Sequence, residues 1–345
     1  MAESTEMDYK SLPKIELHAH LNGSLSTSCL TELYHMKYPN TDDPPSHING
    51  YKILDKFIEL KDCFERFKYA HDLTDTPKRL KRATEIIINE CHDDGVVYLE
   101  IRTTPRATEH MTKEVYLSTI CEAIIECHEK EPKNPIVKLI PSFDRSKGVN
   151  DARDTLDVVL NVREKFPGMI VGIDLSGNPE NTNFPDFKPL LQEARNAGLK
   201  LTLHCAETAG TEEENMEMLE FGMDRMGHGT FMDESPDTWL TLREKKIPVE
   251  CCITSNLKCA TVPDITKHHM QKLLHAEHPV VICTDDYGVF DTSLSKEIQL
   301  CAKTFNLSRE TIQEISLNSV RFSFASTTEK TRLEALIRDF FTQSG

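Results

Sequence analysis

The chain has 345 residues, with 40 basic and 56 acidic side chains and a formal net charge of -16 at pH 7. A surface this negative repels nucleic-acid backbones and anionic membranes, so we expect neither a nucleic-acid polymer nor a membrane as a partner. Apolar residues make up 39% of the chain and the mean hydropathy is -0.42, without an apolar run long enough for a bilayer. The length allows one large α/β barrel or two average domains.

The first residues and the cysteines bear on the compartment. Residues 1–10 carry three acidic side chains and lack both a basic leader and an apolar segment, so we expect no secretory signal. The eleven cysteines follow no repeating frame and mostly lie in apolar runs such as 249–253. We therefore expect reduced, packed thiols and a cytosolic protein.

The first expected strand covers residues 14–17 and leads into His18-Ala19-His20. Side chains two residues apart on a strand lie on one face, so His18 and His20 can aim at the same point. Two converging imidazoles suit a metal ion, although two histidines can also coincide by chance in so short a fragment.

Residues 21–76 separate this strand from the next. The stretch contains prolines at 39, 44 and 45 and a helical pattern from Lys56 to His71. We expect a helical insertion that serves as a candidate lid. His71 ends the helix, and a partly exposed helix-end histidine is the simplest interpretation of it on the sequence alone.

From residue 78 onward, helices alternate with strands. The expected strands are 96–104, 137–143, 170–175, 199–203, 224–227, 248–253 and 279–283, and the expected helices lie near 78–94, 112–130, 150–166, 186–197, 211–222, 235–246 and 266–276. With 14–17 these make eight strands, and the alternation predicts parallel pairing. We expect a single (β/α)8 barrel domain over 1–345, with a helical tail at 294–345 packed outside or under it.

Reactive residues follow the expected strands, and in such a barrel the chemistry gathers at the carboxyl ends of the strands. A doubly wound sheet would not bring all these ends around one centre. In chain order the residues are His18 and His20, Thr104-Pro105-Arg106, Asp144, Ser176-Gly177, His204 and Glu207, His228, Thr254-Ser255-Asn256, and Asp285-Asp286.

Three histidines and one aspartate form a candidate metal site: His18, His20, His204 and Asp285. Such a nitrogen-rich set favours zinc over calcium or magnesium, which prefer oxygen ligands. A purely structural metal site is the alternative, but this ligand set leaves a position for water. A zinc ion there would lower the pKa of that water toward neutrality.

Glu207 and His228 are the candidate acid and base. Glu207 follows His204 by three residues, so its side chain can reach the same end of the barrel as the metal site and carry a proton. His228 lies between two glycines and could steer or deprotonate a water, although an isolated histidine of this kind would be structural. Asp285 and Asp286 could form a solvated acidic turn, but neighbours on a strand point apart, so one can bind metal while the other meets substrate.

Six motifs in this order resemble the pattern of the adenosine deaminase family. The resemblance runs from about residue 12 to 325, and several motifs in order are more specific than one. It implies a barrel of the metal-dependent hydrolase type and one zinc per chain, since the fourth expected strand ends without the lysine of two-metal barrels. The motifs are His18-Ala19-His20, Ser176-Gly177, His204-Cys205-Ala206-Glu207, Gly227-His228-Gly229, Thr254-Ser255-Asn256 and Thr284-Asp285-Asp286.

The resemblance also implies roles in the hydrolytic deamination of a 6-aminopurine. It implies zinc on His18, His20, His204 and Asp285, and catalytic roles for Glu207, His228 and Asp285. Glu207 would protonate N1, and His228 would assist the attacking water. Asp286 would bind N7, and the backbone of Gly177 would contact N3.

One departure from the family pattern concerns phosphate. Adenosine deaminases proper usually read His-x-His-Leu-Asp-Gly, whereas this chain has Asn22 at the aspartate position, which removes an anion that would repel phosphate. The run Thr103-Thr104-Pro105-Arg106 adds hydroxyls and a guanidinium suited to phosphate oxygens. Alternatively, Arg106 could be a surface arginine paired with Glu109 or another carboxylate.

These features resemble the adenosine deaminase-like branch, which converts N6-methyl-AMP to IMP and methylamine. We expect a monomer, and the resemblance implies that its partner is a purine nucleoside monophosphate. The implied substrate-binding residues are His20, Asn22, His71, Thr103, Thr104, Pro105, Arg106, Asp144, Gly177, Glu207 and Asp286.

Two alternatives remain open. An adenosine or AMP deaminase that releases ammonia would differ in the room around the N6 substituent, which residue spacing does not reveal. A catalytically silent purine nucleotide sensor would need neither Glu207 nor a full set of metal ligands.

Overall fold

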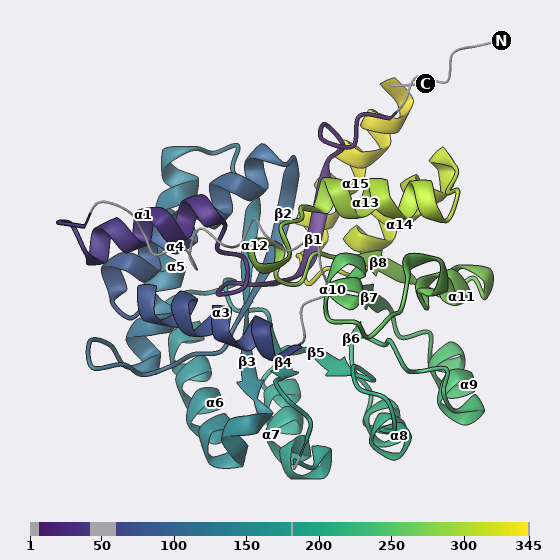
Figure 1. The fold of residues 1–345 in the computed structure, drawn as a ribbon, viewed down its shortest axis with the longest axis horizontal. Coiled ribbons are helices and arrows are strands. Elements are labelled where there is room, and N and C mark those ends of the chain that lie inside the picture. The colour runs from purple at the N-terminus through teal and green to yellow at the C-terminus, as the bar shows by residue number, and fades with distance from the viewer. Residues whose placement is uncertain (1–6, 42–59, 181, 344–345) are drawn as a thin grey trace.

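The computed structural model describes residues 7–41, 60–180 and 182–343. Eight parallel strands follow one another in chain order around a barrel (Figure 1). They are β1 (Lys14–His20), β2 (Val96–Thr103), β3 (Ile136–Asp144), β4 (Gly172–Ser176), β5 (Lys200–Cys205), β6 (Arg225–His228), β7 (Val249–Cys251) and β8 (Val280–Ile282).

The barrel closes where β1 meets the residues after β8. The backbone N–H of His20 donates to the carbonyl oxygen of Asp285 at 2.9 Å, and the N–H of Asp285 donates to the carbonyl oxygen of His18 at 2.8 Å. Two candidate metal ligands from β1 and one that follows β8 are therefore joined by the hydrogen bonds that close the sheet. The expected (β/α)8 barrel is confirmed.

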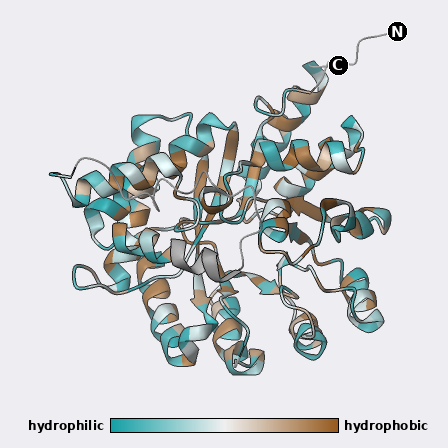
Figure 2. Cartoon of the chain, viewed as in Figure 1, coloured by the Kyte–Doolittle hydropathy of each residue, from teal (hydrophilic) through white to brown (hydrophobic). Residues whose placement is uncertain are grey.

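Helices connect successive strands and cover the outside of the barrel. Their buried positions recur every three or four residues, as in Leu80, Ala83, Ile87 and Cys91 of α4. Figure 2 shows largely hydrophobic strands inside and hydrophilic outer turns on the helices. The connecting helices are α4 (Pro77–Asp93), α5 (Lys113–Lys130), α6 (Gly148–Lys165), α7 (Phe184–Asn196), α8 (Glu212–Phe221), α9 (Pro236–Lys245) and α11 (Met270–His275).

Several boundaries differ from the sequence predictions. β1 continues through both histidines to His20, because pairing with β2 persists to that residue. The strand expected at 248–253 stops at Cys251, and α10 (Ile253–Lys258) follows almost at once. The helix expected at 266–276 is split into a short 3-10 helix, η3 (Ile265–Lys267), and α11. The short helix α12 (Tyr287–Phe290) after β8 was not predicted.

The insertion after β1 contains α1 (Thr27–Lys37) and α3 (Leu60–Leu73). The Ser26 hydroxyl caps α1 by accepting a hydrogen bond from the N–H of Cys29 at 3.1 Å. The expected helix from Lys56 to His71 overlaps α3, which continues to Leu73, and residues 56–59 of the prediction lie outside the described residues. Part of the candidate lid, residues 42–59, lies outside the described residues, so the lid stays a prediction.

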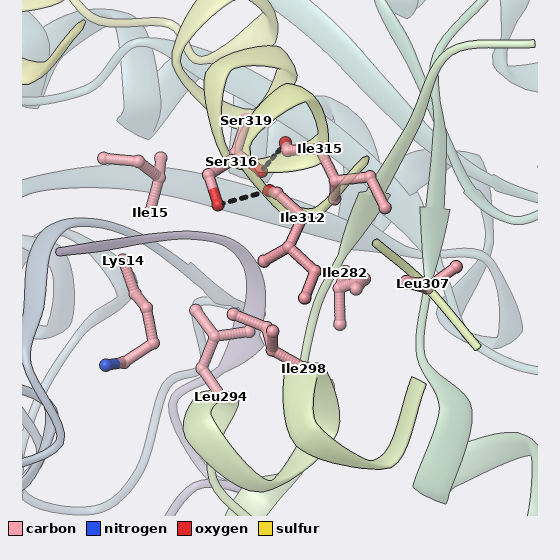
Figure 3. Close-up of a pocket in the computed structure, with 10 residues that line it drawn as sticks. All are labelled: Lys14, Ile15, Ile282, Leu294, Ile298, Leu307, Ile312, Ile315, Ser316 and Ser319. Carbon is pink, nitrogen blue, oxygen red and sulfur yellow. Dashed lines mark hydrogen bonds between the residues drawn. The ribbon is translucent and has the colours of Figure 1, made fainter. Parts of the chain in front are cut away.

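The tail consists of α13 (Leu294–Thr304), α14 (Arg309–Phe322) and α15 (Thr327–Gln343). Figure 3 shows Ile312 and Ile315 of α14 beside Ile282 of β8, around a cavity of about 20 Å³. No candidate site residue lines this cavity. Beyond α14, the guanidinium of Arg225 lies 3.8 Å from the Phe324 ring centroid. α14 therefore packs against β8, and Phe324 after it packs against Arg225 at the start of β6.

The ten cysteines whose side chains the structure describes are all free, and nine of them are buried. The expected packed thiols are thus found for this part of the chain. No helix among the described residues is long and apolar enough to cross a membrane.

Candidate functional site

Four side chains converge at the carboxyl ends of β1 and β5 and just after β8. The Nε2 atom of His20 lies 3.2 Å from Nε2 of His18 and 3.2 Å from Nε2 of His204. Oδ1 of Asp285 lies 3.4 Å from Nε2 of both His18 and His20. The structure thus brings together the four residues that the sequence predicted as metal ligands.

These separations fit a metal ion. Ligand atoms about 2.1 Å from a zinc ion lie about 3.4 Å apart in a tetrahedral arrangement. His228 is the other candidate, because its ring belongs to a group with His18, His204 and Asp285 whose ligand atoms all lie within 4.8 Å. Its Nε2 atom is 4.0 Å from the nearer oxygen of Asp285, so the shorter separations favour His20 as the ligand.

Two buried carboxylates orient the ligand histidines. Nδ1 of His18 lies 2.8 Å from Oε2 of Glu250, and Nδ1 of His204 lies 2.9 Å from Oδ1 of Asp174. A carboxylate beside Nδ1 places the proton on that nitrogen, which leaves the Nε2 lone pair for a metal. The two rings are therefore presented to the cluster in the ligating tautomer.

An ionic layer beneath the cluster keeps these carboxylates charged. Arg102 donates to Glu250 and Thr202 and lies 3.5 Å from Asp174, while Arg225 donates to Glu250 and Glu100. Burial alone would raise the pKa of Glu250, but the two guanidinium groups hold it well below its usual value. The same holds for Asp174, where burial is outweighed by His204 and Arg102.

Asp285 is held from two sides. Its Oδ2 atom accepts a hydrogen bond from the Ser255 hydroxyl at 2.7 Å, which leaves Oδ1 facing the histidines. Its φ of +62° places it in the left-handed region, a costly conformation that the hydrogen bonds closing the barrel enforce. Asp286 lies against Gly23, where an added Cβ would meet the carboxylate at 1.6 Å, so only glycine fits there.

Glu207 and His228 lie beside the cluster. The Glu207 side chain is 38% exposed, and its Oε1 atom is 3.7 Å from Nε2 of His228. The His228 side chain is 2% exposed, and neither ring nitrogen has a hydrogen-bond partner among the described residues. Buried polar atoms are normally paired, so the ring points to a polar ligand or water at this position.

Arg106 follows β2, and its guanidinium lies 5.1 Å from the centroid of the Tyr116 ring. Its guanidinium makes five hydrogen bonds, all to uncharged oxygens of Asn22, His71, Thr74 and Tyr116. Within the described part of the chain it has no carboxylate partner, so the interpretation of a surface pair with Glu109 is wrong. A half-buried cation without a counter-charge is a site prepared for an anion.

Two more basic groups lie near Arg106. Desolvation and the positive charges of Arg106 and Lys147 lower the pKa of His71, although the residue is exposed. The Lys147 Nζ atom is 3.8 Å from Oδ2 of Asp144. Arg106 and Lys147 are therefore both close enough to act on His71, which is neutral at pH 7.

The remaining residues predicted to bind substrate are Gly177, Asp144, Thr103, Thr104 and Pro105. Gly177 has a φ of +90° and approaches Asp144 so closely that an added Cβ would lie 2.4 Å from Oδ1. Asp144 itself accepts hydrogen bonds from the backbone and hydroxyl of Ser146. The Thr103 hydroxyl is 2.7 Å from that of Tyr116, whereas Thr104 and Pro105 make no side-chain hydrogen bond to a described residue.

The sequence analysis missed four residues that support the site, namely Glu250, Asp174, Tyr116 and Lys147, and it named Ser255 without giving it a role. A signal existed for the first two, because each is a charged residue inside an apolar strand and such residues are seldom buried without a partner. No comparable signal marked Tyr116, whose position in α5 resembles that of any core aromatic.

Comparisons with known proteins agree with this geometry. A sequence model of the adenosine deaminase family matches residues 13–340. The adenosine deaminase-like protein of Drosophila melanogaster is 43% identical over 329 residues, which cover 95% of this chain and 96% of that protein. The N6-methyl-AMP deaminase of Homo sapiens is 39% identical over 333 residues, with 94% and 92% covered. The crystal structure of arabidopsis ADAL complexed with IMP superposes with a TM-score of 0.86 at 33% identity and covers 97% of this chain and 98% of its own. The chain belongs to the adenosine deaminase family.

Proposed function

We propose that this protein converts N6-methyl-AMP and water to IMP and methylamine. The observation that carries the proposal is the guanidinium of Arg106, which has no carboxylate partner among the described residues and donates to Asn22, two residues after the cluster residue His20. Because Arg106 follows β2 and the cluster residues His18 and His20 end the neighbouring strand β1, one purine monophosphate could contact the cluster with its base and Arg106 with its phosphate. The names of the human relative and of the arabidopsis complex with IMP support the same substrate class.

The metal that fits the cluster is zinc. Three neutral imidazole nitrogens and one carboxylate oxygen are the donors that zinc prefers, and one such ion per chain would be held by His18, His20, His204 and Asp285. When bound, it would lower the pKa of a water molecule toward neutrality.

The chain's own residues would move the protons. Water adds to C6 of the purine while Glu207 gives a proton to N1, and His228 takes the proton that the water loses. Breakage of the bond between C6 and the exocyclic nitrogen then releases methylamine, which takes the proton held by His228, while the C6 hydroxyl gives its proton to Glu207 and becomes the carbonyl of IMP. A half-exposed glutamate next to a buried histidine suits this exchange, because one group can trade protons with solvent while the other is shielded.

The purine and phosphate would be bound at separate places. Asp286 would hold N7 and the Gly177 backbone would contact N3, as the family resemblance implies. Arg106 would pair with the phosphate, and Asn22, His71, Lys147 and the threonines of 103–106 would line the same end. Asn22 contributes an uncharged oxygen where a carboxylate would neutralise the arginine.

The test is turnover of zinc-loaded protein on adenosine, AMP, N6-methyladenosine and N6-methyl-AMP, with products identified by mass. Turnover of N6-methyl-AMP with little on the two nucleosides is the expected result. Preferred turnover of adenosine would refute the phosphate assignment while keeping the deaminase chemistry. A protein that binds zinc and nucleotide but turns over none of the four would be a sensor, contrary to the proposal.

Two further expectations belong to this proposal. The free cysteines favour a reducing compartment, which supports action in the cytosol. A single chain supplies every residue named above, which supports function as a monomer. Fractionation and light scattering would test these two expectations.

A further inference from the structure

A second group of polar side chains lies behind His228. Asn256 is in α10, and His268 and His269 directly precede α11, next to β7 and β8 (Figure 1). The two histidine rings are stacked, with centroids 4.2 Å apart and planes inclined by 27°. All three side chains are buried, and none has a role in the function proposed above.

The partners of His268 fix its tautomer. Its Nδ1 atom accepts a hydrogen bond from the backbone N–H of Met270 at 3.1 Å, so the ring proton must be on Nε2. That proton is donated to Oδ1 of Asn256 at 3.0 Å. The Asn256 amide can then donate to the Thr230 hydroxyl at 3.1 Å, in the loop that follows His228.

His269 acts on the backbone of His228 itself. Its Nε2 atom lies 2.8 Å from the carbonyl oxygen of His228 and can only donate to it. The N–H of the same peptide unit, from Gly229, donates to the carbonyl oxygen of Cys205 at 3.0 Å. Both polar groups of the peptide between His228 and Gly229 are therefore hydrogen-bonded.

These hydrogen bonds are important because the backbone of His228 has a strained conformation. Its φ is +62°, and the N–H of Gly229 also bonds to the carbonyl oxygen of Gly227 at 2.9 Å, which makes a γ-turn centred on His228. A residue with a side chain keeps such a conformation only where its surroundings enforce it. The turn aims the imidazole at the metal cluster, with its ring centroid 5.0 Å from that of His18.

We infer that His269 is the positioning residue that holds the ring of His228 toward the reacting atoms, and that His268 and Asn256 keep His269 in place. It acts through one backbone carbonyl, that of His228. The inference rests on the proposed role of His228 in the deamination.

Three variants test the inference. His269→Phe keeps a flat ring against His268 but has no donor, while His269→Gln places an amide nitrogen near the former Nε2. The matched control is His278→Phe, because Nε2 of His278 also donates to a backbone carbonyl, that of Ile247 at 2.7 Å, but before the start of β8. The control removes an equivalent buried bond outside the site.

In His269→Phe we expect kcat to fall about tenfold or more, with KM and zinc content unchanged, because misplacing a catalytic group slows the chemical step. His269→Gln should recover most of that loss. His278→Phe should lower the thermal midpoint without the fall in kcat. Equal losses of kcat in His269→Phe and His278→Phe, or in His269→Phe and His269→Gln, would overturn the inference.

A crystal structure of His269→Phe separates this inference from the proposed function. We expect residue 228 to leave the left-handed region and its ring to turn from the cluster. An unchanged φ and ring position would refute the positioning role. A wild-type protein without deaminase turnover would instead refute the proposed function, and the orientation of His228 in the variant crystal would still decide the positioning role.

Discussion

The substitution Asn22→Asp should convert a monophosphate site into a nucleoside site. Oδ1 of Asn22 already accepts hydrogen bonds from Arg106 at 3.2 Å and from the Tyr116 hydroxyl at 3.3 Å. A carboxylate would keep these partners and add a negative charge directly against the guanidinium. Arg106 would then have its counter-ion within the protein, and an incoming phosphate would have to compete with it.

The magnitude follows from the kind of bond exchanged. A hydrogen bond to a charged group in a partly buried site contributes about 1.5–3 kcal/mol. Transferring that interaction from the phosphate to the introduced carboxylate costs the substrate about 2–3 kcal/mol, which corresponds to roughly 30- to 150-fold in kcat/KM. A nucleoside has no phosphate and should lose little.

The assay compares kcat/KM for N6-methyl-AMP and N6-methyladenosine in wild type, Asn22→Asp and Asn22→Ala. The alanine variant removes the acceptor without adding charge, so it controls for the lost hydrogen bonds. The ratio of the two specificity constants should fall strongly in the aspartate variant and only slightly in the alanine variant. If both variants reduce the two substrates equally, the charge argument is wrong.

Four other predictions can be checked. Glu207→Gln should lower kcat by about 100-fold or more while metal content stays near wild type; loss of metal would contradict the assigned role. Arg106→Ala should reduce kcat/KM for N6-methyl-AMP by roughly 10- to 100-fold and leave the nucleoside nearly unaffected; equal losses on both would remove the phosphate argument. Glu250→Gln should weaken metal affinity by about 10- to 100-fold in a chelator competition, as expected for a lost carboxylate beside a ligand histidine; unchanged affinity would mean that the carboxylate does not orient the ligand. The free energy of unfolding should decrease as the pH falls from 7 to 5, because burial lowers the pKa of His268 to about 2 and of His269 to about 4 from 6.5, so the unfolded chain binds protons that the native state does not; a constant urea midpoint over this range would refute it.

Much of the fold and the metal cluster could be predicted from the sequence. The alternation of strands and helices determined the barrel, and the barrel determined where residues such as His18, His204 and Asp285 must gather, since carboxyl ends of its strands share one rim. His18 and His20 were placed on one face by a strand period of two. Distances between these side chains follow from the topology rather than from local propensity.

The supporting contacts could not be predicted in this way. The hydrogen bond from Ser255 to Asp285 spans 30 residues and that between His18 and Glu250 spans 232, so each depends on the register of strands that pair elsewhere. The Tyr116 hydroxyl comes from a helix outside the barrel, and no strand pattern predicts that it reaches Arg106. Local patterns also misjudged β7, because an apolar run from 248 to 253 is compatible with both a strand and the start of α10.

The ionic layer under the cluster is better explained by the site than by stability. Arg102, Arg225, Glu100, Glu250 and Asp174 are each at 0% exposure, and burying charges is costly even when they are paired. Apolar side chains of similar size would often serve stability equally well or better. Apolar replacements would, however, leave Nδ1 of His18 and His204 without an acceptor, and the rings would no longer be held with Nε2 toward the metal position. The buried charges inside this barrel therefore hold the ligand histidines in position. Arg102 links the two carboxylates that lie behind these histidines.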